Sequence, residues 1–260
     1  MCVRGRRDRI GHLVMEECFR KEESVIIPEK YKILSGSALK CIALFTMIVD
    51  HVGLHLLRNS GIVLLDTGMG TLTLFTLMRK VGRLAFPIYC FLLVEGFLHT
   101  HNRKKYGLNL LIFALISEIP WDLEHTGNLQ YPVQNVFFTL FLGYAGLCCI
   151  EELKDRPWEQ LISLIAVTLV AMNLKADYGL GGFAFILVMY LLREEKILQA
   201  VVGTCIESGG WAAGLAFIPI NLYNGKRGFI RGKVMKYAFY AAYPVHIMII
   251  YLIRKETVGF

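Results

Sequence analysis

The chain lacks several patterns that would mark other protein classes. Segments of about ten residues with alternating polarity, typical of membrane β-barrels, are missing, because the apolar runs are long and continuous. A secretory signal peptide is not expected, since the first apolar run begins only near residue 38. Cysteine indicates neither disulfides nor a zinc site, because most cysteines fall inside apolar runs, where they behave as small hydrophobic residues. Those cysteines are Cys41, Cys90, Cys148, Cys149 and Cys205.

Apolar residues dominate instead. They make up 55% of the 260 residues, and the mean hydropathy is +0.49, which is too high for an ordinary soluble domain. Lipid requires that backbone groups bond within their own segment, so we predict an all-α, polytopic integral membrane bundle of one domain, residues 37–256. The apolar runs are 39–57, 84–98, 108–123, 133–150, 161–174, 180–192, 197–223 and 235–253. Residues 62–78 are apolar but interrupted, which fits an outer hairpin or an interfacial segment.

The distribution of charge predicts how the bundle is threaded. The net charge is +7, and its excess lies in short loops, which is the positive-inside pattern of membrane proteins rather than a nucleic-acid surface. The polar, basic residues 1–36 are therefore expected on the cytoplasmic side. A simple alternation of spans would place the basic loop 226–236 outside, so we predict that the run 197–223 is broken at Gly209 and Gly210 and returns to the same side. The result is a bundle of about eight to ten membrane helices.

The most unusual feature is a pair of ionisable residues, Asp50 and His51, inside the first apolar run. Such groups are costly at membrane depth and usually functional there. Lys40 lies eleven residues before His51, so on a helix the two share one face, roughly 16 Å apart along the axis. A cation at the membrane edge and an imidazole at depth suit a long anionic donor such as acyl-coenzyme A. We interpret His51 as a general base, with His55 as a polar neighbour one turn further on.

Other ionisable residues in or beside the apolar runs are weaker candidates. Glu95 and His99 are four residues apart, so on a helix the carboxylate can orient the imidazole; an interfacial histidine beside a structural carboxylate is the alternative. Glu118 is either a functional acid or the ion-pair partner of Arg83, and we favour the structural role.

Two further groups of polar residues follow. Asp177 is in a position to cap the helix that starts after it, although capping does not explain the adjacent Tyr178. The loop 223–228 is flanked by glycine and contains Lys226 and Arg227, which predicts either a phosphate site or a positive-inside turn. After this loop, polar and aromatic residues recur at helical spacing: Lys236, Tyr237, Tyr240, Tyr243 and His246.

Several short motifs, taken in order, resemble the TraX family of conjugal pilin acetylases. They are Ser37–Lys40, Met47–His51, Gly82–Pro87, Glu95–Phe97, His99–Thr100, Ser117–Pro120, Phe137–Leu140, Asp177–Gly179, Tyr223–Gly228, Lys236–Tyr237 and Tyr243–Pro244 with His246. The resemblance covers about residues 36–254. It implies a transmembrane acyltransferase of the bacterial inner (cytoplasmic) membrane, whose first helix carries a basic residue, ten intervening residues and a histidine. Lys40 and His51 fit that spacing.

The resemblance further implies acetyl transfer from cytoplasmic acetyl-coenzyme A, without a metal, to a pilin N-terminus; a saccharide or a small molecule is the other class of acceptor. Because the thioester is already activated, the protein has to position both substrates, deprotonate the nucleophile and stabilise an oxyanion. We assign catalysis to His51 with Asp50, Arg83 and Tyr240, and donor binding to Lys40, Lys226, Arg227 and Lys236.

Two alternatives stay open at this point. A membrane transporter would also carry charged residues and a broken helix along its pathway. A non-catalytic assembly factor of a conjugation or secretion system would tolerate the loss of His51.

Overall fold

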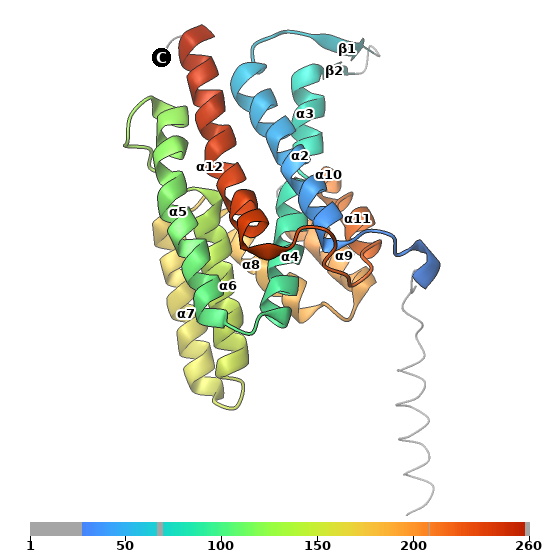
Figure 1. The fold of residues 1–260 in the computed structure, drawn as a ribbon, viewed down its shortest axis with the longest axis vertical. Helices are drawn as coiled ribbons and strands as arrows, with labels where there is room; N and C mark the ends of the chain where they lie inside the picture. The colour runs from blue at the N-terminus through green and yellow to red at the C-terminus, as the bar shows by residue number, and fades with distance from the viewer. Residues whose placement is uncertain (1–27, 67–69, 208, 258–260) are drawn as a thin grey trace, which may run out of the picture.

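The computed structural model describes residues 28–66, 70–207 and 209–257, and it is a bundle of α-helices with one small hairpin of strands (Figure 1). Most of the predicted N-terminal segment, residues 1–27, lies outside the described residues. After a 3-10 turn at Glu29–Tyr31, the elements are α2 (Gly36–Leu56), β1 (Val63–Asp66), β2 (Thr71–Thr73), α3 (Leu74–Gly82), α4 (Ala85–His99), α5 (Arg103–Thr126), α6 (Val136–Glu152), α7 (Pro157–Leu174), α8 (Gly179–Leu191), α9 (Lys196–Ile206), α10 (Trp211–Gly214), α11 (Phe217–Asn221) and α12 (Gly232–Thr257).

Length and composition make this bundle a membrane protein. Within the described residues, five helices are long and apolar enough to cross a bilayer: α2, the combined α3–α4, α5, α7 and α12. On α7 the apolar side chains face outward, with Ile162, Ile165 and Leu169 each about half exposed or more. An apolar surface of this kind is stable when lipid covers it. The prediction of an all-α integral membrane bundle is confirmed.

Local sequence sets where the helices begin and end. Asn102 Oδ1 accepts a hydrogen bond from the N–H of Lys105, 2.8 Å away, and this caps the start of α5. Asn135 caps α6 in the same way through the N–H of Phe137. At the other end of α5 the chain turns at Gly127, whose φ of +72° lies in the left-handed region that favours glycine.

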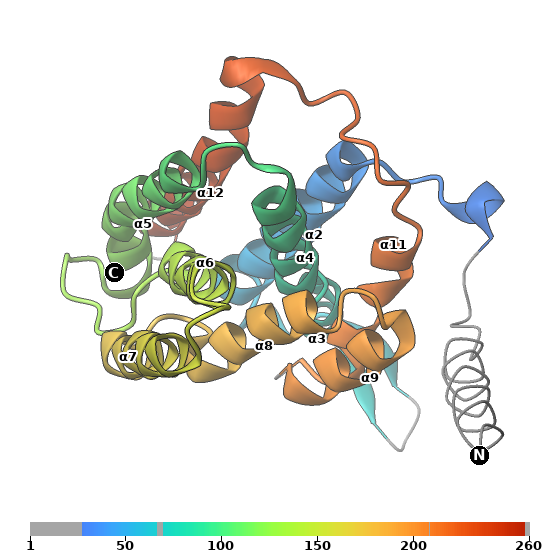
Figure 2. The ribbon, with the colours of Figure 1, turned by 90° about the horizontal axis from the view of Figure 1, so that it is seen from below.

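The bundle has two distinct ends (Figure 1). The connections after α4, α6 and α8 lie together at one end and carry Arg103 to Lys105, Lys154, Arg156 and Arg193; we call it the basic end. The strands β1 and β2 and the C-terminal part of α12 lie at the opposite end, which we call the hairpin end. Seen from below, α4 lies in the middle of the bundle (Figure 2), and its side chains are mostly buried.

The second membrane helix starts earlier than the apolar run at residue 84. Residues 62–78 form the β1–β2 hairpin and the start of α3, and α3 continues into α4 with only a short irregularity at Arg83 and Leu84. Pro87 explains the irregularity, because it has no N–H to donate to the carbonyl of Arg83. The interrupted segment is thus a hairpin followed by the first part of a helix, and the sequence pattern had separated two parts of one span.

The run 197–223 is broken as predicted. Gly210 has a φ of +57°, and the chain turns there between α9 and the short helices α10 and α11. The 11-residue α9 is roughly 16 Å long, which is too short for a full crossing. Residues at both ends of this broken element contact the ring of Phe91. The ring centroid of Tyr223 lies 5.3 Å from that of Phe91, and Nζ of Lys196 lies 6.0 Å from the same centroid. The segment therefore enters and leaves on the same side.

The loop between α11 and α12 folds over the beginning of α2. The N–H groups of Gly36 and Ser37 donate to the carbonyls of Lys226 and Arg227, at 2.8 and 2.9 Å. Ser37 Oγ donates to the carbonyl of Arg227 and accepts from the N–H of Ile230. These bonds satisfy the first turn of α2 and bring the basic loop within one helical turn of Lys40.

Candidate active site

A cavity of about 520 Å³ opens inside the bundle between α2, α4, α6 and α12. Eleven of the side chains singled out from the sequence line it: Lys40, Asp50, His51, Glu95, His99, Asp177, Tyr178, Arg227, Lys236, Tyr240 and Tyr243. Its wall is otherwise mainly apolar and aromatic. A largely apolar cavity with a few convergent polar groups is the usual form of a small-molecule site.

His51 lies at the inner part of this cavity with its ring held in one tautomer. His246 Nδ1 is 2.8 Å from the carbonyl oxygen of Ala242, so this nitrogen carries the hydrogen and donates it. The other nitrogen of His246, Nε2, then accepts from His51 Nδ1 at 2.6 Å. His51 Nε2 therefore keeps its lone pair. A buried imidazole fixed in this way is prepared to take a proton, which is the role predicted for His51.

Asp50, the neighbour of His51, binds Arg79 of α3 through its Oδ2 atom. Gly82 packs directly against this carboxylate, since a Cβ at position 82 would lie 2.1 Å from Asp50 Oδ1. The glycine is thus required by the close approach of α3 to α2. Asp50 contacts the cavity, but its first partner is a guanidinium and not His51, so a direct proton transfer between the two neighbours has no support in the geometry.

The opposite part of the cavity gathers positive charge. Lys40, Arg227 and Lys236 come from α2, the 222–231 loop and α12, and they lie close enough to repel one another. Within the described residues, no carboxylate lies at ion-pairing distance from any of the three. Like charges held together without a counter-ion destabilise a fold, so their arrangement indicates an anionic ligand.

Aromatic side chains form the wall between these two parts. Tyr240 is buried against the rings of Phe113 and Phe137, at centroid distances of 4.9 and 6.1 Å. Tyr178 stacks on Phe86 at 3.6 Å. These contacts fix both phenol groups at the cavity.

Asp177 lies beside Tyr178 in the turn between α7 and α8. It was predicted as a cap, but the residue at the N-cap of α8 is Tyr178, and no side chain caps this helix. Burial raises the pKa of Asp177 to about 6, although attraction to Arg83 opposes the shift. Asp177 is thus a cavity carboxyl and not a helix cap.

The remaining predicted residues lie elsewhere or make other contacts. Glu118 does not pair with Arg83 as expected; it binds the side-chain amide of Asn135, which caps α6. Arg83 does not line the cavity, and its side chain lies against Gly209 at the broken element. Lys226 also stays off the cavity wall, and its N–H donates to Asn224 Oδ1 at 3.0 Å.

The helical pair Glu95 and His99 lies at the mouth of the cavity. His99 Nδ1 is 2.9 Å from the backbone carbonyl of Glu95 and 3.8 Å from its carboxylate. His99 is largely exposed, with 73% of its side chain accessible, so it is an interfacial histidine, which is the alternative that the spacing left open.

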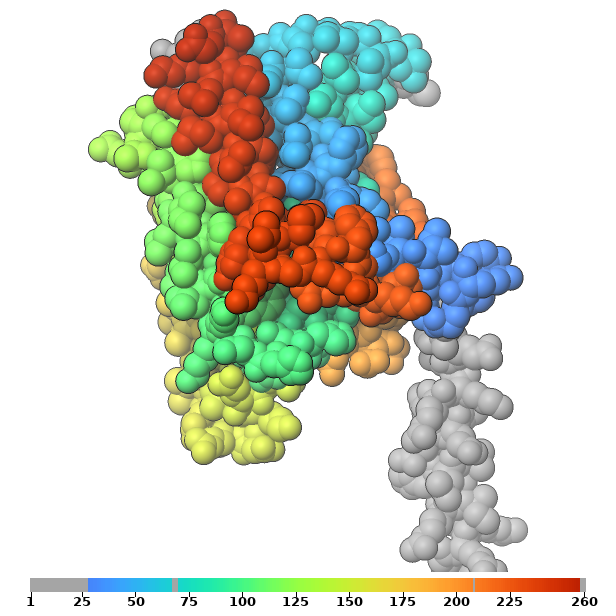
Figure 3. Space-filling model, in the orientation of Figure 1, coloured from blue at the N-terminus to red at the C-terminus, as the bar shows by residue number. Residues whose placement is uncertain are grey.

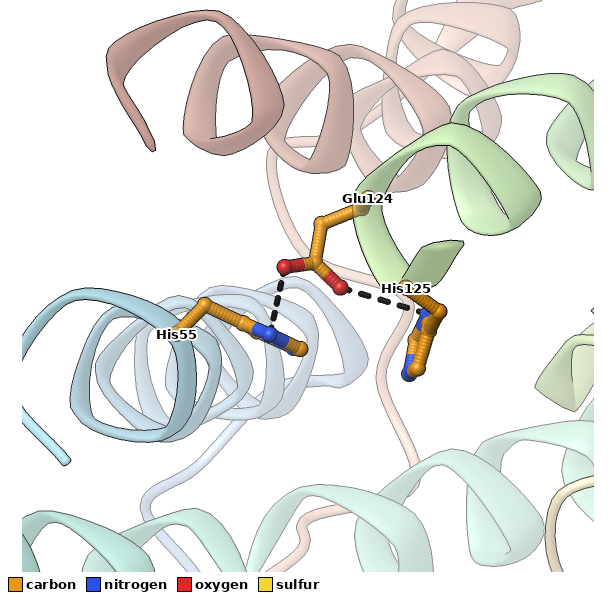
Figure 4. A group of neighbouring side chains, drawn as sticks. All are labelled: His55, Glu124 and His125. Carbon is orange, nitrogen blue, oxygen red and sulfur yellow. Dashed lines mark ion pairs between the residues drawn. The ribbon is translucent and has the colours of Figure 1, made fainter. Parts of the chain in front are cut away.

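Sequence reasoning missed two features of the structure. Arg79 directly follows the interrupted segment 62–78, and the only sign of its role is that Asp50 needs a partner inside an apolar run. The second feature is a buried cluster at the hairpin end, where Glu124 contacts both His55 and His125 (Figure 4). Glu124 and His125 follow the predicted apolar run 108–123, whereas α5 extends through both.

The sequence matches the TraX protein family over residues 35–254. The chain belongs to the TraX family. A relative from Dichelobacter nodosus, named a probable fimbrial assembly protein FimC of serogroup H1, is 29% identical over 245 residues, which cover 83% of this TraX chain and 94% of the relative.

A second, uncharacterised relative comes from Rickettsia prowazekii strain Madrid E. It is 22% identical over 161 residues, which cover 61% of the TraX chain and 56% of the relative. No solved structure matches the chain. The family match confirms the resemblance drawn from the ordered motifs, and the cavity residues Lys40, His51, Arg227 and Lys236 fall within the matched residues.

Proposed function

We propose that this TraX protein is a membrane-embedded acyltransferase that moves an acetyl group from acetyl-coenzyme A to an amine or hydroxyl acceptor. The observation that carries the proposal is one cavity with three cations at one part, each without an acidic partner among the described residues, and a tautomer-fixed imidazole at the other. A donor with phosphates at one end and a thioester at the other matches both. The proposal therefore accounts for the three cations and the imidazole together.

The cationic part fits the phosphates of coenzyme A. Lys40, Arg227 and Lys236 would hold them at the mouth, where the charge stays in contact with water and avoids the cost of entering an apolar interior. The carbonyls of Lys226 and Arg227 already accept hydrogen bonds from the first N–H groups of α2. The phosphates would therefore be bound by side chains and not by the N-terminus of this helix. Lys226 is exposed and adds long-range attraction rather than a direct contact.

The chemistry then follows from the groups at the inner part. The acceptor nitrogen or oxygen attacks the thioester carbonyl, and His51 Nε2 takes the proton that the nucleophile loses. As the tetrahedral intermediate collapses, the carbon–sulfur bond breaks, and the departing thiolate takes that proton from His51. The phenol of Tyr240 lines the same cavity and is our candidate donor to the oxyanion, while Arg83 does not reach the cavity wall.

The distribution of basic residues indicates how the protein is oriented in the membrane. The connections at the basic end carry six lysines and arginines, so this end faces the cytoplasm by the positive-inside rule. In the inner membrane of a bacterium, a protein with this orientation has its cavity mouth open to cytoplasmic acetyl-coenzyme A. The hairpin end then faces the outer side.

The test uses purified protein in detergent, radiolabelled acetyl-coenzyme A and a peptide with a free N-terminal amine, with an N-formyl peptide as control. We expect label in the free peptide only, and loss of labelling in His51→Ala. Wild-type protein that neither binds coenzyme A nor labels any acceptor would contradict the proposal.

The name of the Dichelobacter relative supports a second candidate, a non-catalytic assembly factor for fimbriae. This candidate predicts normal assembly in a strain that carries His51→Ala. The acyltransferase predicts that the same strain makes pili or other surface products without the acetyl group.

A further inference from the structure

The buried cluster at the hairpin end connects three helices. His55 of α2, Glu124 and His125 of α5 and Arg254 of α12 converge there, and Figure 4 shows both imidazoles turned toward the carboxylate of Glu124. Glu124 is 1% exposed. His55, His125 and Arg254 also line a separate hollow of about 680 Å³, whose wall includes Arg58. The cluster therefore joins a buried carboxylate to an opening at the hairpin end.

The hydrogen bonds fix which nitrogen of each imidazole is available. His125 Nδ1 faces two acceptors, the carbonyl oxygen of Trp121 at 2.9 Å and Glu124 Oε2 at 3.2 Å, so it carries the hydrogen. His55 Nδ1 contacts Glu124 Oε1 and donates in the same way. Each ring is left with Nε2 as its basic atom. A carboxylate on the opposite nitrogen stabilises the imidazolium that forms when Nε2 takes a proton.

The position of Arg254 argues for proton chemistry and against a metal ion here. Its Nη1 atom lies 3.1 Å from Glu124 Oε1 and 2.8 Å from the backbone carbonyl of Glu124. A metal ion would have to compete with this guanidinium for the carboxylate, whereas a proton on Nε2 of either imidazole would not.

The cluster also lies next to the proposed base. His55 and His51 are one turn apart on α2, with ring centroids 6.1 Å from each other. His51 lines the first cavity and His55 lines the hollow at the hairpin end. An acceptor that enters by the hollow would pass His55 and His125 before it meets the thioester beside His51.

We propose that the His55–Glu124–His125 cluster removes a proton from a cationic amine acceptor before acyl transfer and releases that proton at the hairpin end. The inference rests on the proposed acetyl transfer and narrows the acceptor to an ammonium, such as a peptide N-terminus. The overall reaction releases one net proton: an ammonium and acetyl-coenzyme A give the amide, the free thiol and one proton. The first proton goes to Nε2 of His55 or His125, and the second passes through His51 to the thiolate. A hydroxyl acceptor would release no net proton.

The test compares two peptides whose N-terminal nucleophiles differ in their charge at pH 7. One has an ordinary N-terminal amine, and the other has an aminooxy terminus, which is uncharged at pH 7. An α-amino group has a pKa of about 7.7–8.0, so only about a tenth to a sixth of the first peptide is neutral at pH 7. A protein without the cluster can use only this fraction.

We therefore expect Glu124→Gln to lower kcat/KM for the amine peptide by about six- to tenfold at pH 7. The loss should disappear at pH 9.5, where the amine is neutral, and it should be absent for the aminooxy peptide at both pH values. His125→Asn should show the same pattern. Because each result is a ratio of two peptides on one preparation, a lower folded fraction does not change it.

Glu151→Gln is the matched control, since Glu151 binds the phenol of Tyr190 on α8, away from the cluster. Its ratio between the two peptides should equal that of the wild type. Equal losses for both peptides in Glu124→Gln would show a structural role and overturn the inference. Wild-type activity of Glu124→Gln on the amine peptide at pH 7 would overturn it too. Failure of the wild type on both peptides would instead refute the proposed acetyl transfer, and this inference with it.

Discussion

Replacing Lys40 by methionine should weaken donor binding and stabilise the empty protein at the same time. Lys40 is held near Arg227 and Lys236, and within the described residues it has no acidic partner. The methionine keeps an apolar stem of similar length and removes only the charge. A lysine with a structural role would lose stability on the same change, so the two interpretations predict opposite signs.

The magnitudes follow from the contacts. A hydrogen bond to a charged group contributes about 1.5–3 kcal/mol, so losing one cation should raise the Kd for coenzyme A by about 10- to 150-fold. Two like-charge repulsions, with Arg227 and with Lys236, cost about 0.2–0.5 kcal/mol each, and their removal should stabilise the unliganded protein by about 0.4–1 kcal/mol. For a chain of this size that gain raises Tm by roughly 1–4 °C.

Thermal unfolding in detergent, with and without coenzyme A, measures both effects. At a ligand concentration of 100 times the wild-type Kd, the wild type should gain about 2.7 kcal/mol, whereas a variant with tenfold weaker binding gains about 1.4 kcal/mol. The difference should shrink as salt is raised, because the mouth of the cavity is open to solvent. A variant that is less stable without ligand, or that binds coenzyme A as tightly as the wild type across the salt series, would refute the reasoning.

Four further outcomes are expected. His51→Ala should abolish acetyl transfer and leave membrane insertion intact, as transfer assays and membrane fractionation will show. His246→Ala should lower kcat by about 10²- to 10⁴-fold without changing the Kd for coenzyme A, because it frees the His51 tautomer; unchanged kcat would remove His246 from the mechanism. Replacing Lys226 and Arg227 together should make coenzyme A binding weaker and less salt-sensitive in titrations. A cysteine at the exposed Phe229, in a chain without its own cysteines, should resist labelling from outside intact cells, and efficient labelling would reverse the orientation.

The fold was predictable where one physical rule dominates. Continuous apolar runs predict membrane helices, and the excess of basic loops predicts the broken element at Gly209 and Gly210, which the structure confirms. The start of the second span was missed, because hydropathy cannot show that α3 continues through Arg83 into α4. Pairing of the β1–β2 hairpin likewise depends on contacts that composition does not encode.

Helical spacing predicted the candidate site only along a single helix, whereas the site residues on other elements came from their own sequence patterns and from the family resemblance. Helical spacing placed Lys40 and His51 on one face, and both line the cavity. Contacts between helices could not be derived in this way: Arg79 on Asp50, Glu118 on Asn135 and His246 on His51 join elements that are far apart in sequence. Each of these pairs is set by tertiary packing, which a period of 3.6 residues does not report.

The two ends of the bundle treat charge in different ways, and the difference indicates what each end does. At the cationic part of the cavity, Lys40, Arg227 and Lys236 repel one another, and this costs stability unless an anion binds. At the hairpin end, Glu124 contacts His55, His125 and Arg254, so these groups have a charged partner without a ligand. Cations without an acidic partner among the described residues favour capture of a charged donor, whereas imidazoles held by a carboxylate can gain and lose protons in place. The two sites meet on α2, where His51 lines the donor cavity and His55 belongs to the hairpin-end cluster. Acyl transfer to an ammonium acceptor requires two bases, one for each proton that the nitrogen loses, and these neighbouring imidazoles provide them.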